Sequence, residues 1–127
     1  MTESKDTSKI LTGKAGEKVA ADYLKKNGYR IVDVNFRCPM GEIDIVARDK
    51  NELVFVEVKA RKSDALGYPE QAVDTRKQKK LSQLAVWYLQ KKKLDKTSAR
   101  FDVVAILMRP EGHDIRLIKN AFDLISF

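Results

Sequence analysis

The sequence has few of the residue types on which many enzyme and cofactor sites depend. Its 127 residues include one cysteine, Cys38, and one histidine, His113. A single cysteine excludes an intramolecular disulfide, and the chain has no Cys/His set of the kind that holds zinc. It also lacks a phosphate-binding P-loop and a dinucleotide-binding glycine pattern. We therefore expect neither thiol nor zinc chemistry, and we expect His113 to be exposed in its turn-like segment, which disfavours a histidine-based nuclease.

Long apolar runs are absent as well. The longest wholly apolar stretch, 103–108, has six residues, whereas a membrane-spanning helix needs roughly twenty. The amino-terminal segment MTESKDTSK carries both signs of charge and no apolar run, so we expect neither a signal peptide nor a lipid anchor. These absences predict a cytoplasmic protein that does not cross a membrane.

Positive charge is abundant. The chain has 25 Lys and Arg against 18 Asp and Glu, a net charge of +7. This excess favours a nucleic-acid partner, because basic side chains release counterions when they neutralise phosphates, although it also suits solubility alone. With 43% apolar residues, the chain can bury a core. We predict a mobile polar tail over 1–11 and a single domain over 12–127.

Apolar spacing predicts the order of helices and strands. A helical pattern begins at Lys14 and closes at Asn27-Gly28. Three strand-like segments follow, YRIVDVNF, GEIDIVARD and ELVFVEVKA, and two more, RFDVVAILM and DIRLIKNAF, end the chain. Between them lies a second helix, for which Asp74 or Thr75 is the expected N-cap. Its apolar stripe consists of Leu81, Leu84, Ala85, Tyr88 and Leu89. The pattern predicts an α/β fold in the order α-β-β-β-α-β-β.

The second and third strand segments are expected to form an antiparallel hairpin. If its loop comprises residues 49–52, Asp44 faces Glu57, and opposed side chains lie about 4.5–5.5 Å apart at Cβ. Lys59 follows two residues after Glu57 and therefore points to the same face. A slip of one residue would move Asp44 to the other face. This register predicts two acids and a lysine side by side.

The hairpin face opposite Asp44, Glu57 and Lys59 is expected to be apolar. The face that carries these charged residues also includes an apolar pair, Val46 opposite Phe55. Both faces are therefore expected to be covered by helices. The predicted apolar face comprises Ile43, Ile45, Ala47, Val54, Val56, Val58 and Ala60.

The acids and the lysine suit phosphodiester hydrolysis. Asp44, Glu57 and the backbone carbonyl of Val58 are hard oxygen ligands of the kind that Mg²⁺ or Mn²⁺ prefers. Lys59 is expected to assist the attacking water and to offset negative charge at phosphorus. The alternative is that Glu57 and Lys59 form an ordinary surface ion pair. The apolar surroundings in VFVEVKA favour the site over the ion pair.

Glu17 is a candidate fourth member of this site. It extends the apolar stripe of the first helix, in line with Ala20, Ala21 and Leu24. It is either a metal ligand or supporting residue, or a first-turn glutamate favoured by the helix dipole.

A basic segment, RKQKK, begins the second helix, where the helix dipole disfavours cations. A phosphate backbone would be attracted both by these side chains and by the free amides of the first turn. A solubilising basic run is the alternative. The candidate nucleic-acid-binding residues are Arg37, Arg61, Arg76, Lys77 and Gln78.

An ordered set of short motifs carries a family resemblance over about residues 13–104. The chain resembles the restriction-endonuclease-like PD-(D/E)xK superfamily and, more closely, the YraN-type bacterial family, which is akin to archaeal Holliday-junction resolvases. The motifs are G-x-x-x-E at 13–17, N-x-R at 35–37, G-E-I-D at 41–44, F-V-E-V-K at 55–59 and K-Q at 77–78.

Matched by position, the resemblance implies that Asp44 and Glu57 are the acidic metal ligands, Lys59 the catalytic lysine and Glu17 the helical acid of resolvase-like members. Ile43 stands where the superfamily motif has proline. The resemblance further implies a mixed central sheet flanked by helices, dependence on Mg²⁺ or Mn²⁺, and cleavage of nucleic acid, most readily branched or structured DNA. By analogy with resolvases it also implies a homodimer. An inactive nucleic-acid-binding module and a protein-interaction domain remain as alternatives.

Overall fold

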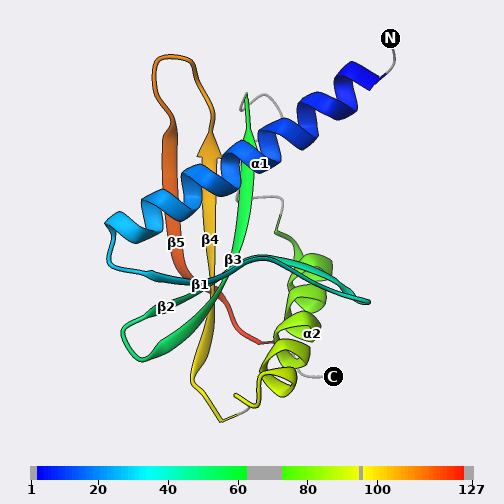
Figure 1. Ribbon diagram of the computed structural model, residues 1–127, viewed down its shortest axis with the longest axis vertical. Coiled ribbons are helices and arrows are strands. Elements are labelled where there is room, and N and C mark those ends of the chain that lie inside the picture. The colour runs from blue at the N-terminus through cyan, green and yellow to red at the C-terminus, as the bar shows by residue number, and fades with distance from the viewer. Residues whose placement is uncertain (1–2, 63–72, 95, 125–127) are drawn as a thin grey trace.

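The computed structural model describes residues 3–62, 73–94 and 96–124, with side chains described from Gly13 onward. The elements follow the predicted order and confirm an α/β fold (Figure 1). They are α1 (Glu3–Lys26), β1 (Arg30–Cys38), β2 (Gly41–Asp49), β3 (Glu52–Arg61), α2 (Thr75–Lys91), β4 (Ala99–Leu107) and β5 (Asp114–Phe122).

The five strands form one mixed sheet in the order β1-β2-β3-β4-β5. The β3–β4 pair is parallel, and the other three pairs are antiparallel. A parallel pair needs a long crossover connection, and α2 lies within the connection between β3 and β4. The mixed central sheet that the family resemblance implied is therefore confirmed.

The two helices lie on opposite faces of the sheet, as the apolar pattern predicted. On one face, Leu24 of α1 belongs to the same buried cluster as Ile45, Val56 and Val104. On the other face, α2 packs against the sheet in a second cluster rich in aromatic side chains. In Figure 1, α1 crosses β3, β4 and β5 on one side, and α2 lies apart from it beside the sheet. The molecule therefore has three layers, α1, the sheet and α2, with one buried cluster between each helix and the sheet.

Close packing fixes α1 against β3 at Gly16. A Cβ atom at this position would lie 2.6 Å from the Cβ of Ala60, which is closer than two carbon atoms can approach. The absence of a side chain therefore lets the helix approach the strand directly. This contact places the next residue, Glu17, over the sheet.

The second helix begins where its sequence predicted. The Asp74 side chain caps it by accepting a hydrogen bond from the Lys77 backbone N–H at 3.0 Å. Four members of the predicted stripe, Leu81, Leu84, Ala85 and Tyr88, are buried, and Leu89 packs partly buried against the same cluster.

The start of α1 differs from the prediction. The helix begins at Glu3 rather than near Lys14, so it includes most of the segment 1–11 that was assigned to a tail. No glycine or proline interrupts residues 3–12, and lysine and glutamate are good helix formers, so the helix continues past the apolar stripe. A domain that starts at residue 12 stays a prediction.

The β2–β3 hairpin has the predicted register with a shorter turn. Arg48 pairs with Leu53 as expected, but Asp49 also pairs with Glu52. The turn therefore consists of two residues, of which Lys50 has a positive φ of 58°, as tight hairpin turns require. Shortening the loop by one residue on each side leaves the register unchanged, although the pairing ends at Ile45 and Val56, one residue short of Asp44 and Glu57.

Candidate functional site

The strands β2 and β3 separate at the two predicted acids. Their pairing ends at Ile45 and Val56, whereas β2 continues to pair with β1 as far as Gly41. Asp44, one residue before Ile45, and Glu57, one residue after Val56, are the first residues beyond the last β2–β3 pair. Figure 1 shows the β1–β2 hairpin leaving the sheet beyond this point and reaching toward α2. We call the point of separation the fork, defined by Asp44, Glu57 and Val58.

A side-chain hydrogen bond replaces the strand pairing at the fork. The backbone N–H of Val58 donates to Oδ2 of Asp44 at 2.8 Å. Val58 thus touches the predicted site through its N–H, and metal ligation by its carbonyl stays a prediction. The hydrogen bond fixes the Asp44 carboxylate beside β3 and keeps the two strands open.

The strand β2 also changes face at the fork. Ile43 packs in the cluster beneath α2, while Ile45 packs in the cluster beneath α1, although residues two apart on a regular strand share a face. The expectation that both belong to one unbroken apolar face is therefore wrong for Ile43. The cause is local irregularity, because Asn35, between the β1 residues that pair with Ile45 and Ile43, has a positive φ of 55°.

Two ammonium groups share one carboxylate oxygen at the fork. Oε2 of Glu57 lies 3.4 Å from Nζ of Lys59 and 3.2 Å from Nζ of Lys77. The Glu57 side chain is only 4% exposed. Lys59 comes from the same strand, as the sequence predicted. Lys77 comes from α2, and its approach to Glu57 was not predicted.

Burial and the neighbouring acids raise the pKa of Asp44 to about 8. Burial of the carboxyl group is the largest cause, and the neighbouring Glu57 carboxylate adds to it. The hydrogen bond from Val58 opposes the rise, while the charge of Glu17 adds a smaller contribution to it. The three acids therefore act on one another electrostatically, and a divalent cation between Asp44 and Glu57 would relieve their repulsion.

Glu17 is held at the site by Asn35, the first residue of the N-x-R motif, and this contact was not predicted from the sequence. Nδ2 of Asn35 donates to Oε1 of Glu17 at 2.8 Å. This bond ties α1 to β1 beside the fork. The motif itself was the signal in the sequence, together with an asparagine in a strand-like run, a residue type that tolerates positive φ.

The donor set fits a divalent cation with two protein ligands. Within the ranges that the structure describes, there is no group of three or more His, Cys, Asp or Glu residues arranged to hold a metal. Asp44 and Glu57 supply two carboxylates, and Glu17 is engaged with Asn35. Mg²⁺ commonly uses one or two carboxylates and keeps several waters, so the pair is sufficient for such an ion.

Of the predicted nucleic-acid-binding residues, only Lys77 joins the fork. Gln78 donates its side-chain N–H to the carbonyl of Val73 at 3.2 Å. Arg37 pairs with Glu42 near the tip of the β1–β2 hairpin at 3.2 Å. Arg61 ends β3, half-buried, and Arg76 is exposed in the first turn of α2.

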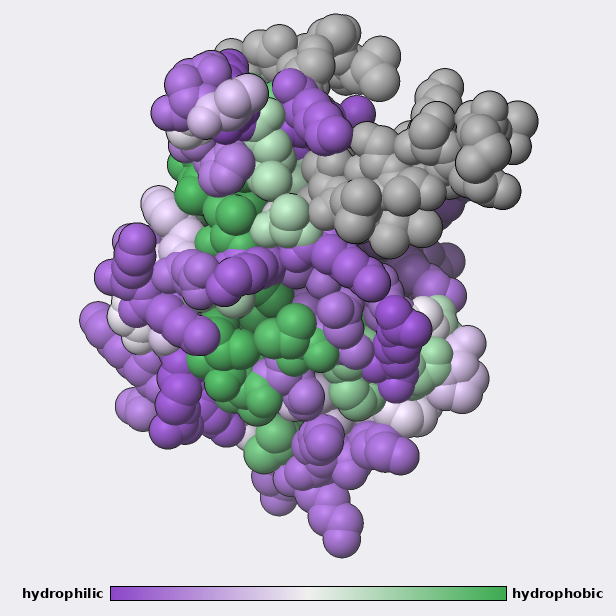
Figure 2. Space-filling model, turned by 45° about the horizontal axis from the view of Figure 1, so that its top comes forward, coloured by the Kyte–Doolittle hydropathy of each residue, from purple (hydrophilic) through white to green (hydrophobic). Residues whose placement is uncertain are grey.

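No helix in the described segments is long and apolar enough to cross a membrane. The face of the molecule in Figure 2 is mostly hydrophilic, with apolar side chains visible between the hydrophilic ones.

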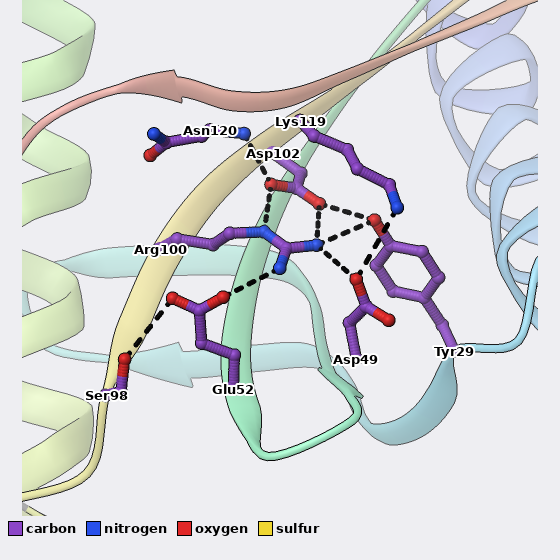
Figure 3. Close-up of polar contacts among 8 residues, drawn as sticks. All are labelled: Tyr29, Asp49, Glu52, Ser98, Arg100, Asp102, Lys119 and Asn120. Atoms are coloured by element: carbon purple, nitrogen blue, oxygen red, sulfur yellow. Dashed lines mark hydrogen bonds and ion pairs between the residues drawn. The ribbon is translucent and has the colours of Figure 1, made fainter.

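A second polar cluster, missed from the sequence, lies at the turn end of the β2–β3 hairpin (Figure 3). Arg100 of β4 pairs with Asp49, Glu52 and Asp102 at 2.7–3.0 Å. Asp102 is fully buried and also accepts a hydrogen bond from the hydroxyl of Tyr29 at 2.7 Å. Burial raises the pKa of Tyr29, and the hydrogen bond to Asp102 adds to the rise. The available signal was an aspartate inside the apolar run FDVVAIL.

The fold and the fork define an α/β protein with a mixed sheet, in which a buried and a partly buried carboxylate lie together where two strands separate. Residues 16–106 match a family model described as "Uncharacterised protein family UPF0102". The chain belongs to this family, which is the YraN family that its motifs resemble.

Two relatives illustrate the extent of the family similarity. A UPF0102 protein of Syntrophus aciditrophicus (strain SB) is 54% identical over 118 residues, covering 93% of each chain. A UPF0102 protein of Syntrophotalea carbinolica is 43% identical over 116 residues, covering 91% of this chain and 94% of the relative. Among solved structures, SfsA of Pyrococcus furiosus in complex with Ca²⁺ is 19% identical with a TM-score of 0.39, covering 87% of this chain and 63% of that chain.

The crowded acids predict that Asp44→Asn stabilises the metal-free protein. The folded pKa of about 8 lies above the usual aspartate pKa of 3.8, so ionising Asp44 costs stability, and the cost grows as pH rises from about 4 toward 8. Asparagine keeps an oxygen to accept from Val58. We expect the free energy of unfolding in EDTA to rise by about 1–3 kcal/mol at pH 8 and by less at pH 5.

Thermal melts at the two pH values measure this effect. Asp22→Asn, at a half-exposed position on α1 that pairs with Lys18, is the matched control and should change stability little. A lower stability of Asp44→Asn at pH 8 would contradict the account of the fork.

Proposed function

We propose that this chain is a metal-dependent endonuclease that hydrolyses phosphodiester bonds in structured or branched DNA. One observation carries the proposal. A separation between two strands brings the partly buried Asp44 carboxylate beside the buried Glu57 carboxylate, with the ammonium of Lys59 3.4 Å from Glu57. Buried like charges cost stability, and a catalytic role accounts for keeping them.

Each residue of the fork has a distinct role in the proposed reaction. Asp44 and Glu57 would hold Mg²⁺ or Mn²⁺, with the Val58 carbonyl as the predicted backbone ligand. When bound, the ion would polarise the phosphate and offset its developing charge. Lys59 orients the attacking water and stabilises negative charge on the phosphoryl oxygens. Glu17, fixed by Asn35, adds negative charge that favours a cation over an empty site.

The basic side chains around the fork would position the nucleic-acid backbone. Arg76 and Lys77 lie in the first turn of α2, and because Asp74 caps that turn, their side chains would make the contacts with phosphate. Arg37 near the hairpin tip and Arg61 at the end of β3 extend the contact on either side. Because the chain has a net charge of +7, its affinity for nucleic acid would fall as the salt concentration increases.

The proposal also includes a homodimer that cuts two strands, and a cytoplasmic location.

A second candidate is a nucleic-acid-binding module without catalysis. It is favoured by the absence, in the described part of the chain, of a third metal-ligating residue grouped with Asp44 and Glu57. Such a module would keep the basic surface and show no metal-dependent cleavage.

Cleavage assays separate the two candidates. Four-way-junction, flap, single-stranded and linear duplex DNA are incubated with the wild type and with Asp44→Asn, each with Mg²⁺ or Mn²⁺. We expect the wild type alone to cleave, with the branched substrates preferred. Because Asp44→Asn is expected to be the more stable protein, its inactivity would not reflect unfolding. Salt-sensitive binding without cleavage by the wild type would contradict the nuclease and favour the binding module.

A further inference from the structure

The second ammonium on Glu57 is not needed to neutralise it. Lys77 and Lys59 both approach Oε2, at 3.2 and 3.4 Å. One ammonium already balances the charge of one carboxylate. Lys77 is therefore a second cation on the oxygen that the proposed function assigns to a metal ion.

A divalent cation would compete with these ammonium groups. Charges a few ångströms apart repel strongly where water is scarce, and Glu57 is almost fully buried. A dication on Glu57 would therefore favour the departure of one lysine side chain.

The surroundings of the two lysines indicate which side chain would move away from Glu57 when a divalent cation binds. Lys59 is on β3, two residues after Glu57, so its backbone keeps it beside the fork whatever binds there. Lys77 lies in the first turn of α2, which contains no acidic residue and where the helix dipole disfavours a cation. Its side chain is also the more exposed, at 38% against 30%. Among the described residues, Glu57 is the acid paired with Lys77.

A Lys77 side chain released from Glu57 would lie among basic side chains of α2 that suit a phosphate ligand. Arg76, Lys79 and Lys80 in the same helix are exposed. The ammonium would therefore exchange the carboxylate of Glu57 for a phosphate group of a nucleic acid.

We propose that Lys77 is the counter-ion of Glu57 in the metal-free protein and is released to bind a nucleic-acid phosphate when a divalent cation binds at the fork. This inference rests on the proposed function for the metal site and its nucleic-acid partner. Because binding couplings are reciprocal, metal raises the affinity for nucleic acid, and nucleic acid raises the affinity for metal.

The first test measures Mn²⁺ binding by the full chain without nucleic acid, using the electron paramagnetic resonance signal of free Mn²⁺. Lys77→Met removes the competing charge and should bind Mn²⁺ roughly threefold to tenfold more tightly than the wild type. Lys79→Met is the control and should match the wild type, because Lys79 is an exposed lysine of the same helix that forms no ion pair with Glu57 in the described part of the chain. Lys77→Gln serves as a second variant if Lys77→Met does not fold.

The second test measures the affinity for a fluorescent four-way junction by anisotropy, in EDTA and in Ca²⁺. Ca²⁺ should increase the affinity of the wild type. Lys77→Met should match the wild type in EDTA, where Glu57 holds the lysine, and should lose much of the gain in Ca²⁺. Lys79→Met should weaken binding by the same factor in both conditions.

The outcomes separate this inference from the proposed function. Mn²⁺ binding by the wild type with an unchanged affinity in Lys77→Met would overturn the inference and leave the metal site standing. Tighter binding by Lys59→Met instead would overturn it as well, because the other lysine would then be the one displaced. Failure of the wild type to bind Mn²⁺ at all would overturn both.

Discussion

Arg100→Met is expected to lower the free energy of unfolding by about 3–5 kcal/mol, the usual cost of removing one partner from a buried ion pair. The guanidinium group pairs with Asp49, Glu52 and Asp102, and its side chain is only 13% exposed. Asp102 is fully buried, so it would lose its cation without gaining water. These pairs raise the pKa of Arg100 further, with Asp102 as the largest cause.

Urea unfolding followed by circular dichroism measures this loss. Lys119→Met is the matched control, because Lys119 also pairs with Asp49, at 3.6 Å, but is 56% exposed. Its loss should cost no more than about 1 kcal/mol. The double variant Arg100→Met with Asp102→Asn should recover part of the stability, since it removes the unpaired charge as well. Equal effects of the Arg100 and Lys119 variants would contradict a buried network.

Glu57→Gln is expected to reduce metal-dependent cleavage by more than roughly a hundredfold, because even residues that only support a metal ligand are worth 10–100-fold. The amide keeps the shape of the side chain but loses the charge that would hold the metal. Lys59 and Lys77 would lose their shared partner at the same time. Loss of the negative charge disfavours the reaction, while the apolar core is left intact.

Single-turnover cleavage of the preferred substrate measures this effect. Glu42→Gln, which alters an exposed glutamate paired with Arg37 on the neighbouring hairpin, is the control and should retain nearly full cleavage. Circular dichroism verifies that both variants fold. Cleavage by Glu57→Gln within about threefold of the wild type would contradict a role of Glu57 in holding the metal.

The two charged clusters lie toward opposite ends of the β2–β3 hairpin and have opposite effects on stability. Around Arg100, opposite charges pair and support the fold. At the fork, two acids crowd together, and the pKa of Asp44 rises to about 8. Such local destabilisation is common where a protein's function requires it. The contrast is therefore an argument that the fork is a functional site.

Local patterns were enough to predict the hairpin and α2. The register follows from a period of two and a short turn, so placing Asp44 opposite Glu57 needed no knowledge of the rest of the chain. The N-cap at Asp74 follows equally from local chemistry, because its side chain bonds an amide three residues away.

Contacts between distant segments were not predictable in this way. Lys77 reaches Glu57 from α2, and Tyr29 reaches Asp102 across 73 residues. The change of face at Ile43 depends on the backbone of Asn35 in the neighbouring strand. Spacing within one element carries no information about which elements pack together, so these features required the three-dimensional arrangement.

The central claim, that the fork holds a divalent cation, is tested most directly by the anomalous scattering of a crystal soaked in Mn²⁺. The account predicts a peak within coordination distance of both the Asp44 and Glu57 carboxylates, and its absence from crystals of Glu57→Gln. It also predicts that the Lys77 side chain has moved away from Glu57. A fully soaked wild-type crystal without a peak at the fork, or with its only peak elsewhere, would contradict the account.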